Sequence, residues 1–138
     1  MPPDKPFILC VDDEALILLA MRQDLKRRFG ERYSIETALG ATEAAAAIAA
    51  IEAAGSRVAL VICDWYMPGV PGDVFLAELR RSRPGIKSIL MTGQQDEEAI
   101  ARAKEAAGFC AWVGKPWRPE ELARAIAGCL GEGAARCA

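Results

Sequence analysis

Apolar segments alternate with segments of helical periodicity along most of this chain. Five short runs are apolar or alternating and end abruptly at polar or glycine residues, which is typical of strands; they span residues 7–11, 33–38, 58–63, 86–91 and 109–113. Five stretches with helical spacing, high alanine content or a typical helix start follow them, at residues 15–29, 42–54, 73–81, 96–107 and 119–130. The pattern therefore predicts a strand followed by a helix, repeated five times.

The run at residues 58–63 is apolar at every position, which indicates a strand buried on both faces, as in a parallel sheet. Right-handed crossovers between such strands place helices on both faces of the sheet. We predict an α/β fold with a doubly wound, five-stranded parallel sheet in a single domain. The domain is expected over residues 7–130, after a polar lead-in at 1–6 and before a flexible tail at 131–138.

Polar side chains stand at the ends of four of the five predicted strands. Asp12 and Asp13 follow the first, Asp64 the third, Thr92 the fourth and Lys115 the fifth. An aspartate at such a place is ordinarily a turn or cap residue, and a lysine is ordinarily a solvated charge. In an open α/β sheet, however, all these strand ends lie at the edge where ligands bind. Their joint placement favours a phosphoryl site.

These residues belong to motifs that resemble a response-regulator receiver domain, over roughly residues 6–130. The motifs are the Asp-Asp pair at 12–13, Asp-x-x-Met-Pro-x-x-x-Gly at 64–72, the threonine at 92 and Lys-Pro at 115–116. The resemblance implies the strand order 2-1-3-4-5 and a phosphoacceptor role for Asp64. It also implies a histidine kinase or a histidine phosphotransfer protein as the phosphoryl donor.

In that order the first and third strands are neighbours, about 4.8 Å apart, so three carboxylates crowd together. Like charges at such a distance raise one another's pKa unless a cation lies between them. Oxygen ligands with room for water suit Mg²⁺, so we expect Asp13 and Asp64 to ligate it directly, and Asp12 directly or through water. The resemblance adds the backbone carbonyl of Tyr66 as a further ligand.

The chemistry expected at Asp64 is nucleophilic attack on a phosphoryl group, giving an acyl phosphate. The ammonium of Lys115 and the hydroxyl of Thr92 would contact the phosphoryl oxygens. Tyr66 and Gln94, each two residues after a site residue, flank the path of an attacking water. We expect Tyr66 to slow hydrolysis of the acyl phosphate and Gln94 to speed it.

The resemblance further implies a switch in which the Thr92 hydroxyl moves and an aromatic side chain on the fifth strand turns inward. That position is Trp112 here, where the family usually has Tyr or Phe; the plain alternative is a half-buried aromatic on an edge strand. The fourth helix, fifth strand and fifth helix would then present a changed surface to a downstream protein, with a phosphorylation-dependent homodimer as a further expectation. Plausible exposed contacts on that surface are Arg102, Lys104, Arg118 and Arg124.

Composition limits the remaining functions. The 138 residues contain no histidine, which excludes Ser-His-Asp and Cys-His catalysis and means that the chain cannot supply the donor histidine. A net charge of -2 gives no reason to expect nucleic-acid binding, and no apolar stretch predicts a membrane span or signal peptide, so we expect a cytoplasmic protein. The five cysteines show no CxxC spacing and are expected to be buried or tail thiols.

Two other classes share parts of this pattern. A flavodoxin-like binder of a small molecule such as flavin has the same strand order, but Asp12, Asp13 and Glu14 would repel its phosphate. A haloacid-dehalogenase-type phosphatase also uses Mg²⁺ and an aspartate nucleophile, but it requires a second aspartate where Tyr66 stands. A constitutive interaction module is disfavoured by the complete set of site residues. We therefore expect a signalling receiver without turnover of an external substrate, either a stand-alone regulator or a part of a larger protein.

Overall fold

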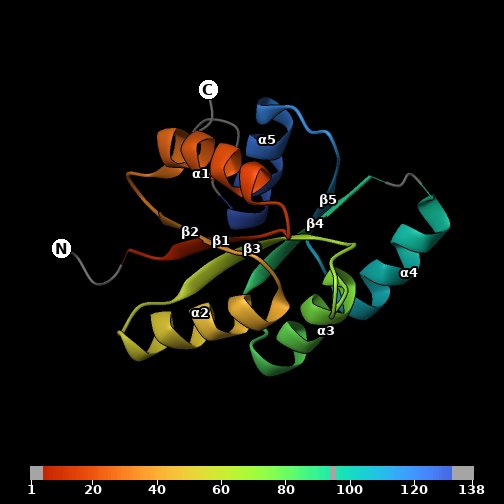
Figure 1. Cartoon of the computed structure of the whole chain (residues 1–138), viewed down its shortest axis with the longest axis horizontal. Coiled ribbons are helices and arrows are strands. Elements are labelled where there is room, and N and C mark those ends of the chain that lie inside the picture. The colour runs from red at the N-terminus through yellow and green to blue at the C-terminus, as the bar shows by residue number, and fades with distance from the viewer. Residues whose placement is uncertain (1–4, 94–95, 132–138) are drawn as a thin grey trace.

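A computed structural model describes residues 5–93 and 96–131 of the chain (Figure 1). Its five strands form one parallel sheet in the order β2-β1-β3-β4-β5. The strands are β1 Phe7–Val11, β2 Ser34–Ala38, β3 Val58–Asp64, β4 Lys87–Thr92 and β5 Ala111–Gly114. The helices are α1 Ala15–Phe29, α2 Ala41–Ala53, α3 Gly72–Ser82, α4 Glu97–Ala107 and α5 Pro119–Leu130. The predicted fold class and strand order are confirmed.

Helices cover both faces of the sheet, with α1 and α5 on one side and α2, α3 and α4 on the other (Figure 1). Each face has its own apolar core, and the central strand β3 contributes to both. Val61 and Cys63 pack on the side of α2 and α3, whereas Leu60 and Ile62 pack on the side of α1 and α5. All of β3 is buried. This double coverage is why its sequence is continuously apolar.

The predicted boundaries hold to within two residues, and the largest error lies at β5. This strand begins at Ala111 rather than at 109 and ends at Gly114. Phe109 is 1% exposed and packs in the core beneath α3 and α4, outside the ladder. Asp64 and Thr92 are the last residues of β3 and β4 rather than the residues that follow them. These two site residues are therefore held by the sheet itself, whereas Asp12, Asp13 and Lys115 follow their strands.

Two further expectations can be compared with the described residues. Cys10, Cys63 and Cys129 are buried as expected, but Cys110 is exposed because it precedes the edge strand β5. Within residues 5–93 and 96–131, no helix has both the length and the apolar character that crossing a bilayer requires.

Candidate functional site

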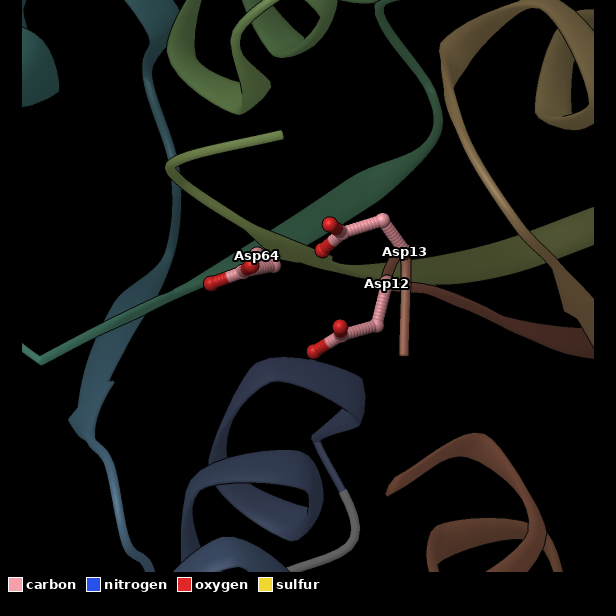
Figure 2. Close-up of side chains that lie close together, drawn as sticks. All are labelled: Asp12, Asp13 and Asp64. Carbon is pink, nitrogen blue, oxygen red and sulfur yellow. The ribbon is translucent and has the colours of Figure 1, made fainter. Parts of the chain in front are cut away.

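Three carboxylates meet where β1 and β3 end (Figure 2). Val11, the last residue of β1, is in register with Cys63, so the chain positions that follow, Asp12 and Asp64, lie side by side. One oxygen of each of Asp12, Asp13 and Asp64 lies within 4.8 Å of the others. Asp12 is fully buried, Asp64 is 6% exposed and Asp13 is open to solvent. Backbone register, rather than any local motif, thus brings the first acidic pair to Asp64.

Lys115 joins this cluster from the segment after β5. Its Nζ lies 3.2 Å from Asp12 Oδ2 and 3.3 Å from Asp64 Oδ1. The backbone N–H of Lys115 donates to the Thr92 carbonyl at 2.9 Å, which fixes the start of the segment against β4. The peptide bond between Lys115 and Pro116 is cis. The lysine therefore contacts two carboxylates from different strand ends, both more than 50 positions earlier in the chain.

The charges of the cluster do not balance. Burial raises the pKa of Asp64 and the Asp12 carboxylate raises it further, while the Lys115 ammonium opposes both. Burial tends to lower the pKa of Lys115, but Asp64 and Asp12 outweigh it and the pKa is raised. One ammonium thus faces three carboxylates. The cluster favours an additional cation, since a cation between like charges relieves their repulsion.

The donor set fits a hard divalent cation. Carboxylate oxygens from Asp12, Asp13 and Asp64 are the ligands that Mg²⁺ prefers, and the exposure of Asp13 leaves a side open to water. Asp12 also accepts a hydrogen bond from the Glu14 backbone N–H at 2.9 Å through Oδ1. That bond and the contact with Lys115 fix the orientation of the Asp12 carboxylate. These three residues could hold a metal ion.

Thr92 is fully buried at the end of β4, opposite Gly114 of β5. Tyr66 is 53% exposed and stacks on the ring of Trp65, with the ring centroids 5.1 Å apart and an interplanar angle of 11°. Gln94 lies outside the described residues. Tyr66 is therefore open to solvent two residues after Asp64, and its effect on an attacking water stays a prediction.

Trp112 is 40% exposed and lies beside α4. It lines a groove of about 310 Å³ together with Glu97, Ile100, Ala101 and Lys104. The aromatic side chain of β5 is thus exposed, and its role as a switch stays a prediction. The basic residues expected on this surface, Arg102, Lys104, Arg118 and Arg124, are also exposed.

The structure gives Gly72 a specific part in the site that the sequence alone did not explain. A Cβ at this position would lie 2.0 Å from the Asp64 carbonyl oxygen. The backbone N–H of Gly72 donates to the Trp65 carbonyl at 2.7 Å and so closes the loop after Asp64. The motif at 64–72 contains this glycine, eight positions after the aspartate. The sequence does not reveal that Gly72 is required because its backbone lies against the Asp64 carbonyl.

The fold and the site together define a class, the doubly wound receiver-type α/β domain with an acidic edge. A family model, the response regulator receiver domain, matches residues 8–127. The chain therefore belongs to this family, whose members act in two-component signalling. The receiver family is a signalling family whose members are generally not turnover enzymes.

Relatives and solved structures agree with this assignment. The chain is 33% identical over 115 residues to the hydrogenase transcriptional regulatory protein HoxA of Cupriavidus necator, and 32% identical over 119 residues to the sensor kinase CckA of Brucella abortus. These alignments cover 83% and 86% of this chain but only 22% and 12% of the relatives. The chain thus spans a small fraction of the curated relatives that it matches.

Solved receiver domains superimpose over nearly the whole chain. The signal receiver domain of an HD domain-containing protein from Pseudomonas fluorescens has a TM-score of 0.81 at 30% identity and covers 93% of this chain and 96% of its own. A CheY-like receiver domain protein from Methanospirillum hungatei has a TM-score of 0.77 at 31% identity and covers 92% and 94%. The fold of this chain is that of a receiver domain.

Proposed function

We propose that this chain accepts a phosphoryl group on Asp64, as the phosphoacceptor of a two-component system or phosphorelay. The observation that carries the proposal is the contact of the Lys115 ammonium with Asp12 and Asp64, at 3.2 and 3.3 Å. A buried cluster of acids with one lysine has little value for stability, since removing charges from water is costly. It suits a site where negative charge arrives on a transferred group. We propose residues 7–130 as the functional domain.

In the transfer, an Asp64 carboxylate oxygen attacks phosphorus as the bond from phosphorus to the donor nitrogen breaks. Burial of Asp64 removes competing water from its oxygens, and Lys115 is placed to contact a phosphoryl oxygen. Thr92, at the end of the adjacent strand, would supply a hydroxyl to another oxygen. A Mg²⁺ ion held by Asp12, Asp13, Asp64 and the Tyr66 carbonyl would neutralise charge on the transferred group.

The donor would be a phosphohistidine outside this sequence, because these 138 residues contain no histidine. A histidine kinase or a histidine phosphotransfer protein has the required chemistry, and the similarity to a sensor kinase is consistent with such a relay. The assignment to the receiver family and the absent second aspartate at Tyr66 favour this function over phosphatase activity.

The acyl phosphate would change the surface formed by α4, β5 and α5. Phosphorylation replaces a single negative charge by a group with a charge of about -1.5 to -2 and three strong acceptors. Thr92 and Lys115 are the residues placed to respond to the added charge. Trp112 lies on β5, the edge strand that Lys115 directly follows. We propose that Trp112 leaves its exposed position in the groove beside α4 when Thr92 moves, and that a downstream protein or a second copy of the chain binds the changed surface.

The decisive experiment is incubation of the purified chain with Mg²⁺ and acetyl phosphate, followed by intact-mass measurement. The wild type should gain one phosphoryl group, and Asp64→Asn should gain none. Removal of Mg²⁺ with a chelator should abolish the gain, and Asp13→Asn should reduce it strongly. If neither acetyl phosphate nor a phosphorylated histidine phosphotransfer protein labels the wild type, or if Asp64→Asn is labelled equally, the proposal fails.

We also propose that Tyr66 and Gln94 set the lifetime of the acyl phosphate. The exposed, stacked ring of Tyr66 would restrict the approach of water to phosphorus, so Tyr66→Ala should accelerate dephosphorylation. Gln94→Ala should slow it, because the amide would no longer hold the attacking water. Both rates follow from the decay of the phosphorylated mass after removal of the donor. An unchanged rate for either variant removes that residue from the proposal.

A further inference from the structure

Two thiols lie together at the edge of the sheet opposite the acidic site. Cys110 immediately precedes β5, and Cys129 lies in the last turn of α5. A helix that packs on a parallel sheet after a strand runs back along it, which brings the last turn of α5 to the start of β5. Ala111, the first residue of β5, packs against the same core cluster as Cys129. The fold thus places the two cysteines next to each other.

The two side chains lie within interaction range. Burial raises the pKa of the Cys129 thiol, the neighbouring Cys110 thiol raises it further, and neither cysteine is in a disulfide. Their environments differ: Cys110 is exposed, whereas Cys129 is only 6% exposed in the core beneath α5. The backbone N–H of Cys110 donates to the Ser88 carbonyl at 2.7 Å, so β4 fixes its position. An accessible thiol therefore stands against a protected one.

We propose that Cys110 and Cys129 form an oxidisable dithiol that closes to an intramolecular disulfide when it meets a low-molecular-weight disulfide such as oxidised glutathione. The Cys110 thiolate attacks one sulfur of the reagent, the sulfur–sulfur bond of the reagent breaks, and one molecule of thiol leaves. The Cys129 thiolate then attacks the Cys110 sulfur and displaces the second thiol. The protein loses two hydrogens and is oxidised by two electrons, and the reagent is reduced to two thiols.

The order of these steps follows from access. Of the two thiols, Cys110 is the one open to a reagent in solution, so it reacts first, and Cys129 resolves the mixed disulfide from within the core. Burial raises the pKa of Cys129, and the neighbouring Cys110 raises it further. Closure should therefore become faster as the pH rises, because the second step requires the Cys129 thiolate.

The disulfide would tie the start of β5 to the end of α5. These are two of the three elements that form the surface proposed to respond to phosphorylation, yet the link lies at the sheet edge away from Asp64. Oxidation would therefore leave the phosphoacceptor accessible while it restricts movement between β5 and α5. Formation of the disulfide does not depend on phosphorylation, so the two proposals can fail separately.

The test uses the full chain incubated with oxidised glutathione, then unfolded and alkylated with iodoacetamide. The reduced wild type should carry five alkyl groups, one for each cysteine, and the oxidised protein three. Peptide mapping should find Cys110 joined to Cys129. Cys137→Ser, which removes the thiol of the tail, is the matched control and should form the same disulfide at the same rate.

Two variants separate the steps. Cys129→Ala should stop at a lasting glutathione adduct on Cys110, and Cys110→Ser should react with glutathione at neither position. Retention of all five alkyl groups after incubation, a lasting adduct on the wild type, a disulfide that includes Cys137, or a covalent dimer as the main product would each overturn the proposal.

Discussion

The most discriminating prediction concerns the charge of Lys115. Lys115→Met keeps most of the length of the side chain and removes the ammonium that lies 3.2 Å from Asp12 and 3.3 Å from Asp64. Asp12 is fully buried and cannot regain water in place of the lysine. In metal-free buffer we therefore expect Lys115→Met to destabilise the folded protein, because it leaves two adjacent carboxylates without a counter-charge.

The magnitude follows from the distances. At an effective dielectric constant of about 20, each contact of Lys115 contributes roughly 5 kcal/mol of attraction. Asp12 and Asp64, with oxygens within 4.8 Å, repel by about 3.5 kcal/mol or more on the same scale. Desolvation offsets much of the attraction, and removal of one partner from a buried pair costs about 3–5 kcal/mol. Since the Lys115 side chain is 19% exposed, we expect a loss near the lower end, about 3 kcal/mol.

Urea unfolding in the presence of a chelator, followed by tryptophan fluorescence, measures this loss. In the Asp64→Asn background the same substitution should cost about half as much, since one attraction and the main repulsion are already gone. Addition of Mg²⁺ should return most of the stability to Lys115→Met. Lys104→Met, on the exposed face of α4, is the control and should change stability by less than about 0.5 kcal/mol. A loss at Lys115 no larger than that of the control, or an equal loss in both backgrounds, would refute the electrostatic argument.

Three further outcomes are expected. Gly72→Ala should lower the free energy of unfolding in urea by about 1–3 kcal/mol and slow phosphorylation, because its Cβ would lie 2.0 Å from the Asp64 carbonyl oxygen. Gly85→Ala serves as the control, since a Cβ there meets nothing within 4 Å. The pKa of Asp64 is raised above 3.8 in the folded state, so in that pH range the folded protein holds a proton that the unfolded chain has released. Metal-free wild type should therefore lose stability relative to Asp64→Asn as the pH rises from 3.8 through the raised pKa. Parallel curves of unfolding free energy against pH for the two proteins would contradict this. Mg²⁺ should raise the Tm of the wild type, measured by circular dichroism, and leave that of Asp13→Asn nearly unchanged.

The sequence predicted the parallel sheet for a physical reason. A run such as that of β3, apolar at every position, is stable only where both faces are covered, so it identifies a central strand of a parallel sheet. Once the strands are parallel, their carboxyl ends share an edge. The acidic cluster needed one thing more, the strand order, which the resemblance to the receiver family supplied. With β1 and β3 as neighbours, their register brings together Asp12 and Asp64, which are 52 positions apart in the chain.

The sequence did not predict which apolar residues enter the ladder at β5. Phe109 and Cys110 continue the apolar run and look like strand residues, but Phe109 fills the core beneath α3 and α4 and Cys110 faces solvent. Hydrophobicity reports burial, and a residue can be buried without pairing in the sheet. The proximity of Cys110 and Cys129 was equally hidden, since it depends on where the last turn of α5 lies relative to the residue that precedes β5.

The error at β5 and the exposure of Trp112 have the same origin. β5 is an edge strand that pairs only with β4, over four residues, whereas β3 pairs on both sides from Leu60 to Cys63. A strand with one neighbour is fixed by fewer hydrogen bonds and by packing on fewer sides. The positions of the β5 side chains are therefore the least constrained by neighbouring strands and the most easily rearranged. Because Lys115 follows this strand directly and contacts Asp64, we expect a change of charge at Asp64 to act first on β5, the part of the sheet with the fewest constraints.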